Sequence, residues 1–336
     1  MVDRFLQLPE TDRKAILDKA AQKLGKSPNI LEKDVWVCWA LEKLVNMPEV
    51  PSLAFKGGTS LSKAFDAIAR FSEDVDVTLD RRALDPDLDP FTAPSKTQAK
   101  NICAQLETLL AVYIVDVIKP YFDEHLQAEL KDGTVETRIG DSVGKLHIPY
   151  PTCLESEDSY LQESVLLELG GKNEITPSNQ FQLEPYIRSI VPSLEFPLPT
   201  VDVLVAERTY WEKATLIHAE CNRKNMKPNA ERLSRHWYDL FQLNKSEIGS
   251  AALDDLKLLE EVVNQKNVLY PSGWAKYNDC LGSLRLIPDD TSLKSLEEDF
   301  QQMRANAMFW EEPETFPNIL DELSKLETTI NNMFST

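Results

Sequence analysis

Two acidic residues alternate with valines in the segment 72–77, which reads SEDVDV. Alternation over a β-branched run predicts a strand, and side chains two residues apart on a strand share a face. Asp74 and Asp76 are therefore expected to point one way, and Val75 and Val77 toward the core. Adjacent carboxylates repel each other, and a hard divalent ion shared with substrate phosphates is the usual solution. The segment predicts a metal site; the alternative is a solvated edge-strand face.

A glycine turn precedes these acids. An apolar run at 53–55 ends in KGGTS, and apolar residues then recur at helical spacing at Leu61, Phe65 and Ile68. Free backbone N–H groups at a helix N-terminus suit a phosphate. The spacing of a P-loop and the GxGxxG pattern are both absent. The candidate phosphate-contacting residues are Lys56, Gly57, Gly58, Thr59, Ser60, Lys63 and Ser72.

Some of these residues have an alternative interpretation that involves no ligand. Lys56 and Lys63 are alternatively solvated charges, and Ser72 is alternatively a strand cap. Glu73 is expected to point away from Asp74 and to lie at the surface. A third acid, Glu168, interrupts the apolar run SVLLEL at 164–169, which predicts a buried strand. Burying a carboxylate is costly without a partner, so Glu168 is a candidate third metal ligand; the alternative is a salt bridge to an arginine such as Arg188.

Composition bounds the class of protein. The chain has 336 residues, 42% hydrophobic and 27% charged, which is typical of a globular protein of about two domains. Its net charge of −19 disfavours nucleic-acid binding by the whole surface but leaves room for a local basic groove. Arg223, Lys224 and Lys227 form the clear basic cluster, as an RNA guide or as a solvated loop.

Cysteine and histidine usage disfavours a zinc or redox centre. The five cysteines form no CxxC pair, and the four histidines show no metal-ligand spacing. The N-terminus lacks an apolar signal region, and no apolar run approaches the ~18 residues that a membrane span needs. We expect a protein of the cytoplasm with no membrane partner.

The pattern of elements predicts an α/β (α+β) domain over 1–205 and a mostly helical domain over 206–336. Strands are expected at 53–55, 72–77, 135–139, 145–150, 164–169 and 199–205. Helices are expected at 11–24, 29–45, 97–118, 121–130, 207–220, 229–243, 248–263, 292–308 and 317–333. The helix after the glycine turn is expected to reach Ala69.

The order of these motifs resembles the polymerase-β-like nucleotidyltransferases. The wording KGGTSLSKAF and RFSEDVDV more closely resembles the AbiEii/AbiGii toxin family of phage-defence and toxin–antitoxin systems. Three further segments support the resemblance: LEKD at 31–34, ERTYWEKA at 207–214 and RLSRHWYDL at 232–240. It covers roughly residues 30 to 245. One departure is His236, which stands where the family commonly has an acid.

The resemblance implies a mixed-sheet nucleotidyltransferase domain followed by helices that complete the active-site cleft. It implies two Mg²⁺ ions, or Mn²⁺, held by Asp74, Asp76 and Glu168. It places Lys213 on the nucleotide phosphates and lets Asp239 shape the site, as a base or by orienting that lysine. Without the family, Lys213 reads as an exposed lysine paired on its helix, and Asp239 as a surface acid.

The implied reaction is transfer of a nucleoside monophosphate from an NTP to RNA, notably the 3′ end of tRNA, which would block translation. A separately encoded antitoxin is the implied partner. Two alternatives stay open: an NTP-binding toxin or interaction protein that does not transfer, and transfer of nucleotide or phosphate to a protein or small molecule.

Overall fold

The computed structural model describes residues 3–130, 135–154, 162–223 and 232–334. Its contacts divide the chain into two compact units. The first comprises Met1–Ala64, Phe71–Asp89 and Ile102–Leu204, and the second Phe65–Arg70, Pro90–Asn101 and Val205–Thr336. The short segments Phe65–Arg70 and Pro90–Asn101 thus pack with the helices that follow residue 205. Lys224 and Lys227 of the basic cluster lie outside the described residues.

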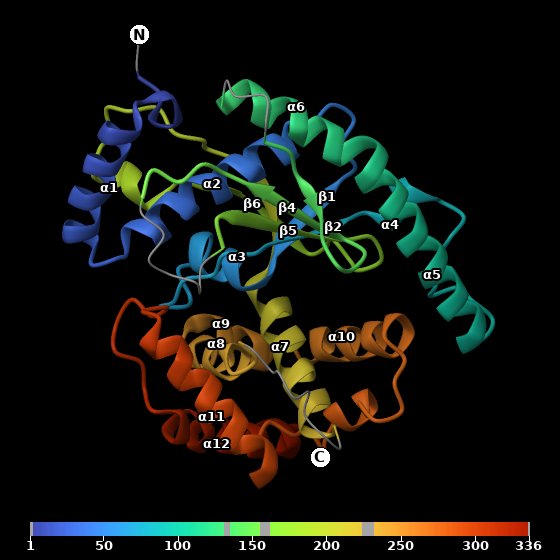
Figure 1. The fold of residues 1–336 in the computed structure, drawn as a ribbon. Helices are drawn as coiled ribbons and strands as arrows, with labels where there is room; N and C mark the ends of the chain where they lie inside the picture. Colours follow the sequence, from blue (N-terminus) through green and yellow to red (C-terminus); the bar gives the residue numbers. More distant parts are fainter. Residues whose placement is uncertain (1–2, 131–134, 155–161, 224–231, 335–336) are drawn as a thin grey trace. The chain divides into compact units, whose positions relative to one another are not determined.

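The first unit is built on a β-sheet flanked by helices (Figure 1). The sheet has seven strands in the order β3-β4-β5-β2-β1-β7-β6. The pairs β1–β7 and β2–β5 are parallel, and the other neighbours are antiparallel. This mixed sheet with helices confirms the predicted α/β class. The strands are β1 Leu53–Lys56, β2 Val75–Leu79, β3 Arg138–Ile139, β4 Lys145–Pro149, β5 Ser164–Gly170, β6 Ser178–Gln182 and β7 Thr200–Leu204.

Three of these strands differ from the sequence prediction. The strand β2 begins at Val75, so residues 72–74 lead into it rather than forming it. Only Arg138–Ile139 of the predicted strand 135–139 pairs, with both residues exposed at a sheet edge. The edge strand β6 was missed because its sequence SNQFQ is polar and lacks a β-branched run.

Helices of the first unit pack against the sheet. The helix α2 Pro28–Val45 contacts β5 and β7, and 13 of its 18 residues are buried. The other helices are α1 Glu10–Leu24, α3 Gly57–Lys63, α4 Arg81–Leu84, α5 Lys96–Tyr113 and α6 Lys119–Leu130. The sequence prediction that α3 extends to Ala69 is wrong, because the helix ends at Lys63 and Asp66 adopts a positive φ of 47°.

A continuous helical path runs from Lys96 to Leu130, because a π-helical stretch, Ile114–Ile118, joins α5 to α6. Pro120 does not interrupt it, contrary to expectation: the proline directly follows the π-helical stretch, where the Lys119 N–H bonds the Ile114 carbonyl five residues back. By length and composition alone, the path is apolar enough to cross a membrane. An 18-residue stretch within it has a mean hydropathy of 1.5, and 28% of that stretch is buried. The expectation that no apolar run reaches this length is therefore wrong. Leu106, Leu110, Ile114 and Ile118 of the path are buried, whereas Val112, Val115 and Val117 are exposed.

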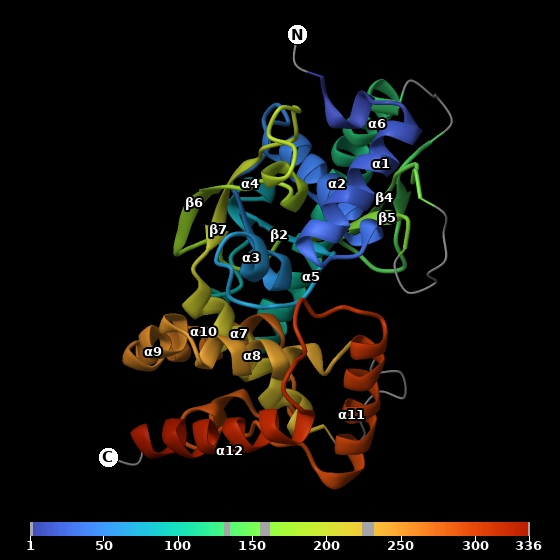
Figure 2. The same ribbon diagram turned by 90° about the vertical axis from the view of Figure 1, so that its left-hand side faces the viewer.

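The second unit is helical (Figure 2). Its central helix α7 contacts α8, α9 and α10, and α12 packs on α8. The predicted helix 248–263 is two helices, because Asp255 ends α9 and caps α10 by accepting the Leu258 N–H. The helices are α7 Ala206–Cys221, α8 Arg235–Asn244, α9 Glu247–Asp254, α10 Leu256–Leu269, α11 Asp290–Ala305 and α12 Phe316–Met333.

Candidate functional site

Four charged residues form a row across the middle of the sheet. The register pairs Lys56 of β1 with Asp76 of β2, Asp76 with Glu168 of β5, and Glu168 with Lys145 of β4. Directly paired residues on neighbouring strands point to the same face. Residues far apart in the chain therefore meet on one sheet face as a cation, two acids and a second cation.

Asp74 lies next to this row. It precedes β2 by one residue and stands two positions before Asp76, and both side chains are half-buried while Val75 and Val77 are buried. Its carbonyl oxygen accepts a 2.5 Å hydrogen bond from the Thr59 hydroxyl. The expected alternation of acids and valines is present, and α3 fixes where the first acid enters the strand.

Gly57 makes room for Asp76. The glycine adopts a φ of +80°, and a Cβ there would lie 2.1 Å from Asp76 Oδ2. Any other residue would be strained by the backbone and would collide with the carboxylate. The close approach of turn and acid explains the glycine at this position.

The hydroxyl groups of the glycine turn form hydrogen bonds with nearby backbone carbonyls. Thr59 and Ser60 are fully buried, and Ser60 Oγ donates to the Gly57 carbonyl at 2.9 Å. With the Thr59 hydroxyl on Asp74, both side chains hold the turn together. Ser72 is half-buried just before the acids.

The Lys63 side chain is buried and paired with an acid. Its Nζ lies 2.5 Å from Asp34 Oδ1 and 3.0 Å from the Glu184 carbonyl, and its side chain is 2% exposed. Burial alone would lower the pKa of this lysine, but the Asp34 carboxylate raises it above its ordinary value. The ammonium stays charged and links α3 to α2, and its burial against Asp34 gives no support to the prediction of Lys63 as a phosphate ligand.

Glu73 is a second correction. The sequence placed it at the surface, but it is buried and forms a hydrogen-bonded ion pair with Lys33 of α2. Lys33 also donates to the Gln162 carbonyl at 3.0 Å. Since Glu73 directly precedes Asp74, this pair fixes the backbone that presents the acid.

Glu168 has a partner that the sequence analysis did not name. Its Oε1 lies 2.7 Å from Lys145 Nζ, with side-chain exposures of 34% and 38%. Arg188, the partner considered from sequence, instead pairs with Glu184. The hydrogen bond to Glu168 raises the pKa of Lys145 despite desolvation, and the charges of Asp74 and Asp76 add to this effect. Lys145 was missed because only strand pairing brings it to Glu168.

Within the described ranges, no group of three or more His, Cys, Asp or Glu side chains is gathered closely enough to hold a metal ion. Asp76 and Glu168 are register partners with Asp74 beside them, but the three carboxylates do not converge. The Glu168 carboxylate is directed to Lys145 rather than to Asp76. The donor chemistry still suits a hard cation, since Asp74, Asp76 and Glu168 offer carboxylate oxygens alone.

A second charge cluster lies in the helical unit. Arg70 binds Asp239 through two hydrogen bonds, Nε to Oδ1 at 2.6 Å and Nη2 to Oδ2 at 2.7 Å. Lys213 Nζ lies 2.7 Å from the same Oδ2. All three residues are buried, and Asp239 is fully so. The alternatives of an exposed lysine and a surface acid are therefore wrong.

Electrostatics keep this cluster charged. Burial would raise the pKa of Asp239, but Arg70 and Lys213 hold it well below its usual range. Burial lowers the pKa of Lys213, with Arg70 adding to this effect and Asp239 opposing it. Arg70 is a residue whose role the sequence analysis missed, because its partner lies far along the chain.

His236 borders this cluster. Burial of its ring, together with the charges of Lys213 and Arg235, holds the pKa of His236 well below 6.5. Its buried Nδ1 finds no hydrogen-bond partner among the described residues. His236 is therefore a neutral imidazole at neutral pH.

The described part of the basic cluster is already paired. Arg223 forms two 2.8 Å hydrogen bonds with Glu220 and lies over the Trp274 ring at 4.0 Å. Its charge is compensated locally, which weakens the argument for Arg223 as an RNA contact.

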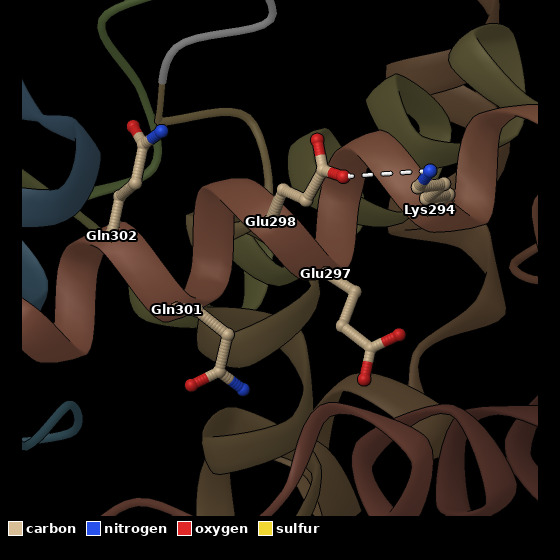
Figure 3. Close-up of a pocket in the computed structure, with 5 residues that line it drawn as sticks. All are labelled: Lys294, Glu297, Glu298, Gln301 and Gln302. Atoms are coloured by element: carbon tan, nitrogen blue, oxygen red, sulfur yellow. Dashed lines mark ion pairs between the residues drawn. The ribbon is translucent and has the colours of Figure 1, made fainter.

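A shallow hollow follows one side of α11 (Figure 3), lined by Lys294, Glu297, Glu298, Gln301 and Gln302. These side chains are exposed, and the pair Lys294–Glu298 is 4.0 Å apart. The hollow contains none of the predicted site residues and has no buried polar group to bind a ligand.

The chain is similar to a known protein family and to a solved structure. A family model described as nucleotidyl transferase AbiEii toxin of a type IV toxin–antitoxin system matches residues 39–322. Among solved structures, the chain is similar to MenT4, a nucleotidyltransferase toxin from Mycobacterium tuberculosis H37Rv. The identity is 16%, the alignment covers 95% of this chain and 98% of that one, and the TM-score is 0.44. No curated protein matches the chain in sequence.

The family match spans most of the chain and includes the glycine turn, all three acids, Lys213 and Asp239. The chain belongs to the AbiEii family and is a nucleotidyltransferase toxin of a type IV toxin–antitoxin system.

Proposed function

We propose that this toxin transfers a nucleoside monophosphate from an NTP to the 3′ end of tRNA in the cytoplasm and thereby blocks translation. The observation that carries the proposal is the placement of Asp76 beside Glu168 in register, with Asp74 two residues earlier and Gly57 against the Asp76 carboxylate. Such an all-carboxylate set beside a glycine turn suits a metal–nucleotide complex.

Asp74, Asp76 and Glu168 are the residues that would hold Mg²⁺ or Mn²⁺. Gly57 supports this assignment, because it leaves open the space beside Asp76 Oδ2 that a Cβ would fill. When bound, two such ions stabilise the charge that develops on the attacking and leaving oxygens of the phosphoryl group.

The protein's own groups contribute positioning. The backbone of Gly57 and Gly58 is the proposed phosphate cradle, with Thr59 and Ser60 fixing its shape through their hydrogen bonds. Lys56, in register with Asp76, is the proposed phosphate cation of this turn. For Lys213 we retain a phosphate contact, with Asp239 holding its ammonium in place.

The test is incubation with each labelled NTP and total RNA, followed by a gel. We expect label on tRNA, and an Asp76→Asn variant should lose about a thousandfold in rate because it removes a metal ligand. The control is Asp202→Asn, an exposed acid on β7 of the same unit, which should keep its rate.

Other outcomes favour the alternatives. Label on protein rather than RNA would support a protein acceptor, with which the net charge of −19 agrees. Tight NTP binding without product on any acceptor would support a binding protein. If label does reach tRNA, its aminoacylation and cell-free translation should both decline in step with the modified fraction.

A further inference from the structure

Lys145 occupies a distinctive place in the charged row. Its ammonium bonds Glu168 across the antiparallel pair β4–β5. Glu168 is in turn the register partner of Asp76. Lys145 thus supplies positive charge to an acidic cluster at the point where a divalent ion would be expected to do so.

The direction of the Glu168 carboxylate is the second observation. Three acids lie on or beside neighbouring strands, yet within the described residues no three of them converge into a metal-binding group. Glu168 bonds Lys145 at 2.7 Å instead. The carboxylate that would complete a metal site is therefore engaged by a lysine of the same sheet.

The strength of this pair decides what it can do. Both side chains are about a third exposed, at 38% and 34%. Ion pairs at such exposure contribute little to stability, so the bond can be exchanged at low cost. A divalent ion carries twice the charge of an ammonium and has several oxygen ligands.

We propose that Lys145 is an internal counter-ion that holds Glu168 when no divalent ion is bound and competes with that ion for Glu168, which lowers the metal affinity of the free protein. This inference rests on the proposed function, because the ion is the one that the three acids would hold. It makes Lys145 a positioning residue rather than a catalytic one.

The experiment measures Mn²⁺ binding to the full-length protein by electron paramagnetic resonance, without nucleotide or RNA. Lys145→Met should bind Mn²⁺ about fivefold more tightly than the wild type, because the competitor is gone. Adding Glu168→Gln to that variant should cancel the gain. Lys172→Met is the matched control, since Lys172 pairs with Glu107 at 2.5 Å outside the row, and it should leave Mn²⁺ affinity unchanged.

A second readout covers stability. In EDTA, Lys145→Met should melt about 1–2 °C below the wild type, because repulsion among the acids is no longer compensated. Saturating Mn²⁺ should remove the difference. Lys145→Gln replaces the methionine variant if circular dichroism shows loss of structure, and the same gain in affinity is expected.

Equal or weaker Mn²⁺ binding by both neutral variants overturns the inference, and so does a gain that persists when Glu168 is replaced. Neither measurement involves nucleotide transfer. If wild-type protein labels no acceptor but Lys145→Met still binds Mn²⁺ more tightly, the counter-ion stands and the transfer reaction does not.

Discussion

The two charge clusters of this protein use the same residue types in opposite ways. On the sheet, half-buried Asp74, Asp76 and Glu168 lie beside Lys145, whose ion pair with Glu168 is partly open to solvent. In the helical unit, one fully buried carboxylate, Asp239, is held by Arg70 and Lys213 together. The first arrangement keeps its carboxylates partly exposed to solvent, whereas the second encloses its acid between two cations.

The difference separates a partly exposed cluster, whose ion-pair partners can be exchanged, from a buried ion-pair network, whose partners are fixed. We call the first the exchange site. Burial makes an unpaired charge very costly, so Asp239 and its partners form a set whose members depend on one another. Partial exposure lowers that cost on the sheet, so ligands can be exchanged there. A sequence pattern of acids and lysines does not reveal which kind of cluster it will form.

Replacing the buried carboxylate should have the largest effect on stability. Asp239→Asn leaves Arg70 and Lys213 facing each other in the interior, and should cost about 3–5 kcal/mol of unfolding free energy. Urea denaturation followed by tryptophan fluorescence measures it, since Trp237 is buried on the same helix. Glu298→Gln, at an exposed pair on α11, should change stability by less than about 0.5 kcal/mol. A similarly small effect of Asp239→Asn would contradict the interdependence of Asp239, Arg70 and Lys213.

The glycine turn tests the exchange site. Gly57→Ala should destabilise the protein by about 1–3 kcal/mol through backbone strain, and should also displace the Asp76 carboxylate, which a Cβ would approach within 2.1 Å. Metal-dependent transfer should therefore fall by far more than stability explains.

Gly25→Ala is the matched control for that variant. Gly25 also has a positive φ, +64°, but nothing lies within 4 Å of its Cβ position. It should show strain without loss of transfer. Equal losses of transfer in the two variants would mean that the approach of Gly57 to Asp76 has no functional consequence.

His236 gives the smallest effect, visible as a pH dependence. The folded protein holds the pKa of His236 well below 6.5, so the unfolded chain binds a proton first as pH falls. The free energy of unfolding should decrease as pH is lowered below 6.5, and His236→Gln should flatten that decline. His125→Gln is the control, because His125 Nδ1 already bonds the Tyr121 carbonyl at 2.9 Å. An unchanged slope in His236→Gln would show that the ring is protonated in the folded state.

Much of the exchange site was predictable from sequence. The alternation of Asp74 and Asp76 with valines and the glycine turn are local patterns, and Glu168 stood out as an acid in an apolar run. These features depend on neighbours within a few residues. Each feature therefore produces a local sequence pattern that can be recognised without the structure.

The partners of these residues were less accessible. Glu73 reads as a surface acid until Lys33 is found beside it, and Lys63 reads as a phosphate ligand until Asp34 is found. Lys145 meets Glu168 only through strand register, and Arg70 meets Asp239 across 169 positions of sequence. Long-range pairing of charges has no local periodicity, so it could not be predicted.

The helix α2 carries three consecutive charged residues that are all buried, Glu32, Lys33 and Asp34. Each binds a different distant segment: Glu32 accepts the Cys153 N–H at 3.0 Å, Lys33 pairs with Glu73, and Asp34 accepts the Tyr186 N–H at 2.8 Å. Contacts this distant in sequence form late and slow the folding of a chain.

These partners set an order of events during synthesis. Residues 32–34 leave the ribosome before their partners do: Glu73 follows first, then Cys153, and Tyr186 last, so Asp34 is the last of the three to gain the contact described here. A nascent chain therefore completes the packing of α2, and with it the support beneath the glycine turn, only after most of the first unit has been translated.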